Sequence, residues 1–410
     1  MMEWYYRYLI SVGLLFYLFP VKCENPLAPA LYVFGDSLVD SGNNNFLKTS
    51  NKANYSPYGI DFSVGATGRF TNGNTIADVI AQLLELPMVP PYLGLSEAQK
   101  NQILTGVNYG SGSAGILRET GLAGGENLCL EEQVKMFRKT VQSYLPRNFE
   151  TQDELLRYLS KAIFVVEIGS NDYINNYLKP QLYNSSLIYT PEQFGALLVH
   201  QLKQYLTDLY NLGARKFIVF GIGVIGPIGS IPTSVNKQKL RNAREKDKDQ
   251  LRSNPENGLH RTLQEMITAI ITTLQRSSLS SRDDKLSITS TEDENQLVTY
   301  FNNGLLVILE ELNAMLQGST FVHIDVYALN YDIVQNPSKY GFSDRSPCCV
   351  VGGNGLCIMD VLPCQDRSKY IRWDYFHPTE RVTSIFADRC LNFTYDSPCS
   401  ALNIYQLVEK

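Results

Sequence analysis

The chain has 410 residues, of which 44% are hydrophobic and 19% are charged. This composition supports a sizeable core and excludes a chain that is disordered throughout. The formal net charge is −5, which argues against a nucleic-acid partner, because such partners select a basic surface. The length is compatible with one large α/β domain or with two or three smaller domains.

The first 23 residues are typical of an export signal. Arg7 is followed by 14 uncharged residues, which include the apolar run LISVGLLFYLFP. This run is shorter than the ~20 residues that span a membrane. A signal peptide over residues 1–23 is therefore favoured over a membrane anchor. We expect cleavage near Cys23 or Glu24, a secreted protein of the extracellular space or cell wall, and no stable membrane span in the mature chain.

Four apolar runs predict strands buried on both faces, at residues 30–35, 162–169, 215–222 and 320–327. Amphipathic periodicity predicts helices between them, over residues 74–86, 130–145, 190–214 and 299–316. In the third helix Thr190 is the cap, Pro191 takes the first helical position and Gly213 marks the end. Alternating strands and helices indicate a three-layer α/β/α sandwich with a mostly parallel sheet. Ligands of such sheets bind at the carboxyl ends of the strands.

Residues 236–290 interrupt this alternation. A polar stretch in which Lys and Arg outnumber Asp and Glu is followed by one amphipathic piece and a Ser-rich run. The composition is typical of a solvated or disordered insertion, which is favoured over a nucleic-acid-binding or membrane-binding arm. We interpret residues 24–410 as a single domain that this insertion interrupts.

The eight cysteines fit an oxidising compartment. Loss of Cys23 with the signal leaves seven, so at least one has no intramolecular partner. Four of them crowd into CCVVGGNGLCIMDVLPC, where Cys348 and Cys349 are adjacent and no Cys-x-x-Cys pair is near. Disulfides are therefore favoured over a zinc site. Three N-glycosylation acceptors also fit export, namely Asn54, Asn184 and Asn392.

The stretch FGDSLVDSGNNN places Gly35, Asp36 and Ser37 at the end of the first predicted strand. Gly35 permits a tight exit from the strand into a helix, where Ser37 would present its hydroxyl and backbone N–H at the sheet edge. The same residues are ordinary in turns, and the stretch alone favours a turn over a nucleophile. Asp36 and Asp40 suit the holding of this turn better than the service of a distant histidine.

A serine nucleophile needs a base. His377 stands in WDYFHPTE, three residues after Asp374 and just before a predicted helix start. Asp374 could accept the Nδ1 proton and leave Nε2 free to take the proton of Ser37. The alternative is that His377 is only a polar residue ahead of a helix. The other histidines lie in a helix, in the insertion and in a strand, at His200, His260 and His323.

Two further polar stretches follow apolar residues. IGSNDY places Asn171 beside Gly169 after the second predicted strand, where a side-chain amide suits an oxyanion, although an Asn-Asp turn explains the stretch alone. In GVNYGSGSAGI, Gly112 could offer a backbone N–H to the same oxyanion, with Gly110 and Gly115 close by. No Gly-Lys-Ser/Thr phosphate motif and no His-Glu-x-x-His metal motif is present. We expect no cofactor and no metal.

These four blocks, in this order, resemble those of the plant secreted GDSL esterase/lipase family, within the SGNH hydrolases of flavodoxin-like fold. The stretches GRFTNGNTIADVIAQLL and CCVVGGNGLC are also similar to that family. The resemblance covers roughly residues 28–235 and 298–400. The chain departs from the family where Ser230 replaces a cysteine and where a second cysteine is missing, which implies a lost disulfide. This departure also suggests that residues 236–290 come from a retained intron, a different splice choice or a recent insertion.

The resemblance implies a secreted, monomeric serine hydrolase of carboxylic esters, acting on acyl lipids or small acyl esters. Ser37 would be the nucleophile, His377 the base and Asp374 its orienting acid. The oxyanion hole would comprise the N–H groups of Ser37 and Gly112 and the side chain of Asn171. A secreted glycoprotein that binds acyl or glycan ligands without catalysis is the alternative of a different class. A deacetylase of wall polysaccharides would need the same residues as a lipase.

Overall fold

The computed structural model describes residues 26–225, 291–393, 397 and 399–410. The predicted signal peptide, the predicted insertion, His260 and Ser230 therefore lie outside the described residues.

Five parallel strands form the central sheet in the order β2-β1-β3-β4-β5. The strands are β1 (Leu31–Gly35), β2 (Gly106–Asn108), β3 (Ile163–Glu167), β4 (Lys216–Phe220) and β5 (Thr320–Ile324). Four of them fall within the four predicted runs. This order is that of flavodoxin-like folds, in which ligands bind where the strand order reverses, between β1 and β3.

Within the central sheet, β2 is the strand that no apolar run predicts. It has three residues, too few for a periodicity to be seen, and it begins with a glycine. Gly106 adopts a φ of +107°, and a Cβ there would lie 1.8 Å from the backbone oxygen of Leu31. Glycine thus lets β2 approach β1 closely, where a side chain would force the strands apart.

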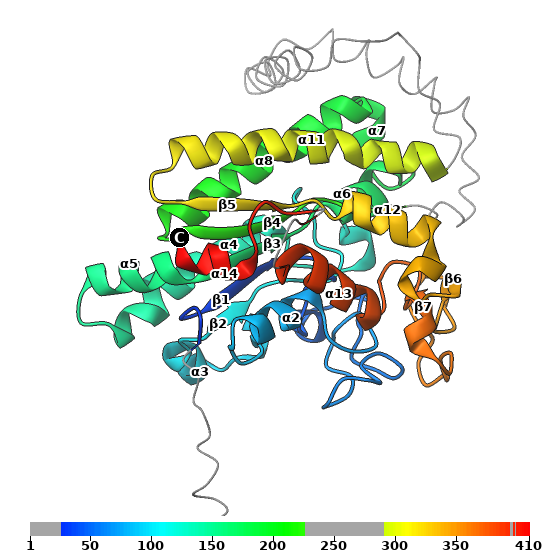
Figure 1. Ribbon diagram of the computed structural model, residues 1–410, viewed down its shortest axis with the longest axis horizontal. Coiled ribbons are helices and arrows are strands. Elements are labelled where there is room, and N and C mark those ends of the chain that lie inside the picture. Colours follow the sequence, from blue (N-terminus) through cyan, green and yellow to red (C-terminus); the bar gives the residue numbers. More distant parts are fainter. Residues whose placement is uncertain (1–25, 226–290, 394–396, 398) are drawn as a thin grey trace, which may run out of the picture.

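Helices cover both faces of the sheet (Figure 1). Tyr32 and Phe34 of β1 pack on one face with α4 (Leu130–Lys139), α5 (Gln152–Lys161), α8 (Pro191–Asn211) and α11 (Thr291–Met315). Leu31 and Val33 pack on the other with α2 (Ile76–Leu83), α12 (Tyr327–Gln335), α13 (Glu380–Phe386) and α14 (Ile404–Glu409). Successive side chains along one strand therefore contribute to the cores on opposite faces of the sheet. The three-layer α/β/α fold is confirmed.

Local sequence signals explain where several helices begin. The Thr190 side chain accepts the Gln193 N–H and Pro191 is the first residue of α8, as predicted. The α-helix predicted over residues 130–145 ends at Lys139 and continues as a π-helix, Thr140–Tyr144. The shorter elements are α3 (Glu97–Gln102), α6 (Ser170–Asp172), α7 (Ser185–Ile188), β6 (Asp344–Pro347) and β7 (Tyr370–Arg372), of which β6 and β7 form a separate parallel pair.

Three disulfides lie in the last part of the chain, and they pair Cys348 with Cys364, Cys349 with Cys357, and Cys390 with Cys399. Disulfides rather than a zinc site thus occupy the cysteine-rich stretch, as predicted. Cys129 is free and buried. Across the described part of the chain, no helix combines the length and apolar character needed to cross a membrane.

Candidate active site

Ser37 lies on a turn at the carboxyl edge of the sheet. The Asp36 backbone N–H donates to the backbone oxygen of Glu167, and the Leu38 N–H donates to Asp36 Oδ1 at 3.0 Å. A Cβ on Gly35 would lie 2.1 Å from the backbone oxygen of Glu167, so glycine permits β1 to end against β3 here. The predicted exit into a helix is wrong, because a turn follows β1 and the next helical segment is a short 3-10 helix, Asn43–Phe46.

The structure brings Ser37, His377 and Asp374 together, with His377 within hydrogen-bond distance of the other two side chains. Ser37 Oγ lies 2.8 Å from His377 Nε2, and His377 Nδ1 lies 2.8 Å from both carboxylate oxygens of Asp374. Asp374 and His377 are buried, and the Phe70 ring packs on the imidazole with a centroid distance of 5.0 Å. The segment leads into α13, with Thr379 in the N-cap position, close to the predicted helix start.

The backbone of Gly112 does not fit the role predicted for it. Its N–H donates to Asp40 Oδ2 at 3.1 Å, so it is engaged by a carboxylate. The next residue, Ser113, lines the same cavity as Ser37 and adopts a left-handed φ of 61°, which non-glycine residues rarely do. Within the described segments, the backbone N–H groups of Ser37 and Ser113 have no hydrogen-bond partner. Such a strained residue beside a site is a functional signal that sequence does not carry.

Asn171 reaches the site from α6, directly after β3. Its Nδ2 donates to Asp36 Oδ2 and to the Ala114 oxygen, both at 3.1 Å, while its Oδ1 accepts from Asn175 Nδ2 at 2.7 Å. The side chain thus lies on the cavity wall beside Ser37, as the sequence predicts. Both of its amide protons are engaged in this arrangement.

Two buried carboxyl groups lie under Ser37. Burial raises the pKa of Asp36 to about 6. Burial, and then the neighbouring Asp36 charge, hold the pKa of Glu167 well above its ordinary value. Glu167 was not a predicted site residue, since an acid at the end of an apolar run gives no signal of its own.

Asp40 holds the turn that follows Ser37. Its Oδ1 accepts the N–H groups of Gly42 and Asn43, both at 2.7 Å, in addition to the Gly112 contact. Burial raises the pKa of Asp40 to about 6. The prediction that Asp36 and Asp40 serve the turn is therefore confirmed by their contacts.

A cavity of about 410 Å³ opens beside Ser37 and His377. Its polar wall includes Ser113 and Asn171. A large apolar portion is contributed by the end of β4 and by α2, α12, β7 and α13, through Ile76, Phe220, Ile225, Val326, Val334, Ile371, Val382 and Phe386. A concave apolar site with a few convergent polar groups is what small-molecule sites share.

The remaining predicted positions lie away from this cavity. Asn54 and Asn184 are exposed and Asn392 is half-buried. His200 Nε2 contacts Gln204 on α8, and His323 lies on β5. In the described ranges, no group of three or more His, Cys, Asp and Glu side chains is arranged to hold a metal ion.

A hydroxyl, an imidazole and a carboxylate in series, at the carboxyl edge of a parallel α/β sheet, have the arrangement of the serine hydrolases. The chain belongs to the GDSL-like lipase/acylhydrolase family, whose sequence profile matches residues 31–390. It is 38% identical to GDSL esterase/lipase 7 of Arabidopsis thaliana, over 94% of this chain and 93% of that protein. A second GDSL esterase/lipase of that plant is 37% identical over 97% of both chains. The resemblance seen in the sequence is confirmed, and the protein is an ester-bond hydrolase.

Proposed function

We propose that the protein is a secreted serine esterase/lipase that hydrolyses esters of apolar carboxylic acids through an acyl-enzyme on Ser37. One observation carries the proposal: Ser37 Oγ and Asp374 both lie 2.8 Å from His377, at opposite nitrogens of its ring. All three groups come from one chain, which suits an enzyme that acts as a monomer.

The geometry supports a two-step reaction. His377 Nε2 takes the proton of Ser37 as the oxygen attacks the ester carbonyl, and Asp374 holds the imidazole in the required tautomer. The same nitrogen then returns the proton to the leaving alcohol. Water, activated by His377 in turn, releases the acid from the acyl-enzyme. Only a neutral His377 can act as the base, so activity is expected to fall on acidification.

We assign the oxyanion hole to the free backbone N–H groups of Ser37 and Ser113, with Ser113 in place of Gly112. Each such donor is worth about 3 kcal/mol in the transition state. Asn171 is the third proposed donor. Its amide would turn one proton from Asp36 or from the Ala114 oxygen toward the charge that develops on the substrate.

The cavity supports an apolar acyl group as the part of the substrate that the enzyme recognises. Aliphatic and aromatic side chains from five elements line it beside Ser37, and burial of each CH₂ group of a substrate contributes about 0.8 kcal/mol. An acetyl group on a polysaccharide would leave most of this surface uncovered. The lining thus favours an esterase for larger apolar acyl groups over a deacetylase.

Secretion is part of the proposal. Three disulfides support an oxidising compartment, together with the leader predicted at residues 1–23. We propose Asn54 and Asn184 as glycan carriers because both are exposed, and we keep Asn392 as a third acceptor.

The reaction is tested with p-nitrophenyl butyrate and a fluorophosphonate probe. Ser37→Ala and His377→Ala should lower kcat by at least ~10³-fold and abolish labelling. His323→Ala, which removes a histidine that does not line the cavity, is the matched control and should retain both signals. Parent-like hydrolysis by Ser37→Ala would overturn the mechanism. Absence of labelling in the parent would favour a binding protein.

The acyl preference is tested separately, with p-nitrophenyl esters from acetate to octanoate and with acetylated xylan. The value of kcat/KM should rise with chain length up to the size of the cavity and should fall for the longer esters in Val334→Trp, which fills the apolar wall. A flat series, or faster release of acetate from xylan than of octanoate, contradicts the acyl preference and leaves the Ser37 mechanism standing.

A further inference from the structure

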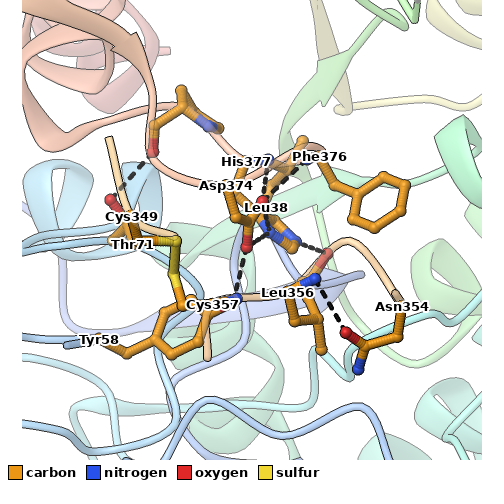
Figure 2. A network of polar contacts seen from close by, with 12 residues as sticks. Leu38, Tyr58, Thr71, Cys349, Asn354, Leu356, Cys357, Asp374, Phe376 and His377 are labelled. Carbon is orange, nitrogen blue, oxygen red and sulfur yellow. Dashed lines mark hydrogen bonds and ion pairs between the residues drawn. A yellow bond between two sulfur atoms is a disulfide. The ribbon is translucent and has the colours of Figure 1, made fainter. Parts of the chain in front are cut away.

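Tyr58 contacts the carboxylate that orients His377. Its side chain is buried, and its hydroxyl donates to Asp374 Oδ2 at 2.7 Å. The same oxygen accepts the backbone N–H of Cys357 at 3.1 Å (Figure 2). A phenol has a single proton to give. Because Cys357 supplies a donor to the phenol oxygen, that proton is directed to Asp374.

The Asp374 carboxylate is fully buried. Its Oδ1 accepts the backbone N–H groups of Phe376 at 2.8 Å and His377 at 2.9 Å, contacts that follow from the local turn. Its Oδ2 accepts from Tyr58, which is the one side chain other than His377 that donates to it among the described residues. The backbone thus holds Oδ1, and Tyr58 holds Oδ2 against rotation of the carboxylate plane about its Cβ–Cγ bond.

The disulfide between Cys349 and Cys357 connects both sides of this contact. Cys357 holds the Tyr58 hydroxyl through its N–H. Cys349 donates its own N–H to the backbone oxygen of Trp373, the residue before Asp374, at 3.0 Å. Figure 2 shows this bridge beside Tyr58 and Asp374. Both of these cysteines belong, with Tyr58 and Trp373, to one small buried cluster that is separate from the two cores of the sheet.

We propose that Tyr58 is a positioning residue for ester hydrolysis, which orients the Asp374 carboxylate toward His377. The Cys349–Cys357 disulfide fixes the position of the Tyr58 hydroxyl relative to this carboxylate. The proposal rests on the proposed role of His377 as base. Burial, and then the Asp374 charge, hold the pKa of Tyr58 well above its ordinary value. The phenol thus remains a donor throughout the working range of pH.

Loss of this hydrogen bond has a predictable sign. Without the phenol proton the carboxylate keeps more of its negative charge, and it holds a protonated imidazole more strongly. His377 would then stay protonated to a higher pH, and the acid limb of the pH profile of kcat/KM would move upward. Among the described residues, the charged and titratable groups facing the pair are Tyr58, Tyr55, Arg372 of β7 and Asp36 after β1. Apart from Tyr58, all of them are unchanged in the variant.

The test is Tyr58→Phe, with Tyr55→Phe as the matched control. Tyr55 packs edge-on against Tyr58 and donates its hydroxyl to the Cys357 oxygen at 2.9 Å, without contacting Asp374. We expect Tyr58→Phe to lower kcat about tenfold with little change in KM, the size of a lost hydrogen bond to a charged group, and to raise the midpoint of the acid limb by about half a pH unit or more. Tyr55→Phe should leave the acid limb in place.

A double-mutant cycle keeps the proposal testable even where stability changes. In an Asp374→Asn background, Tyr58→Phe should cost less than twofold further, because its route to His377 is already lost. Cys349→Ser combined with Cys357→Ser should move the acid limb in the same direction as Tyr58→Phe. An unmoved acid limb in Tyr58→Phe, an equal shift in Tyr55→Phe, or additive losses in the cycle would each overturn the proposal. Full activity of Ser37→Ala would instead defeat the mechanism on which it rests.

Discussion

At the scale of single residues, the groups of the candidate site divide into those with a sequence signal and those without one. Ser37 stands in a polar stretch after an apolar run, and Asp374 and His377 lie three residues apart just before a predicted helix start, so all three could be named as candidates. Tyr58 and Glu167 carry no such signal, because their neighbours come from segments far away in the chain. Ser113 was missed for a related reason, since only the backbone conformation shows which N–H is free and which is engaged by Asp40.

Glu167 leads to a prediction about pH and stability. Its folded pKa is raised above the ordinary 4.5 by burial and by Asp36, so the folded protein keeps a proton that the unfolded chain releases. The free energy of unfolding must then fall as pH rises above 4.5 toward and through the raised pKa. In Glu167→Gln the side chain cannot titrate, and its amide N–H takes the place of the Glu167 proton as the hydrogen-bond donor to Asp36. Its Tm should fall less than that of the parent between pH 5 and pH 8, by about 2 °C or more.

Thermal scans across this range check the result. Glu150→Gln is the control, because Glu150 is exposed, and it should follow the parent at every pH. Equal slopes for the parent and Glu167→Gln would show that Glu167 has no raised pKa in the folded protein.

At the scale of elements, capping and burial decide where helices begin. The helix α2 starts with a capping box in which Thr75 and Asp78 bond reciprocally. Asp78 also pairs with Arg69 in a bidentate contact, with both N–O distances 2.7 Å. This ion pair is almost fully buried, and it fixes the segment before α2 against the helix that lines the cavity.

Arg69→Met tests this pair, because it leaves the Asp78 carboxylate buried without its cation. Breaking a buried pair by removal of one partner costs about 3 kcal/mol or more. Arg367→Met is the matched control: Arg367 forms the same bidentate contact with Asp61 in a more exposed position, where a pair is worth about 1 kcal/mol or less. Denaturant titration should separate the two variants. Equal losses in the free energy of unfolding would mean that burial does not determine how much these ion pairs contribute to stability.

At the scale of the whole molecule, the covalent framework is concentrated in the C-terminal part. All three disulfides of the described residues lie beyond residue 347. The Cys390–Cys399 disulfide packs into the core that contains α2 and α13, and the core on the other face of the sheet holds none. Cys129, at the start of α4, is buried, and burial raises the pKa of its thiol. A buried thiol with a raised pKa reacts poorly.

Alkylation of the native protein should therefore leave the Cys129 peptide unmodified at pH 8, and denaturation without reductant should expose it. Peptide mass mapping checks both states and the three pairings in one experiment. Rapid alkylation of Cys129 in the folded enzyme would place this thiol at the surface and contradict its packing. Cysteines recovered in other pairs would contradict the bonds on which the Tyr58 proposal depends.

By itself, the sequence determined the parallel α/β class and the alternation of buried strands and helices, and it named Ser37, His377 and Asp374 as candidate site residues. Each of these leaves a local trace, as an apolar run, a cap or a short polar block at the end of a strand. Tertiary structure alone decided that β2 joins the sheet, that the Gly112 N–H is engaged by Asp40 while that of Ser113 is free, and that Tyr58 reaches Asp374. These outcomes depend on contacts between segments up to 316 residues apart, and the chemistry of such a contact leaves no pattern in the neighbours of either residue.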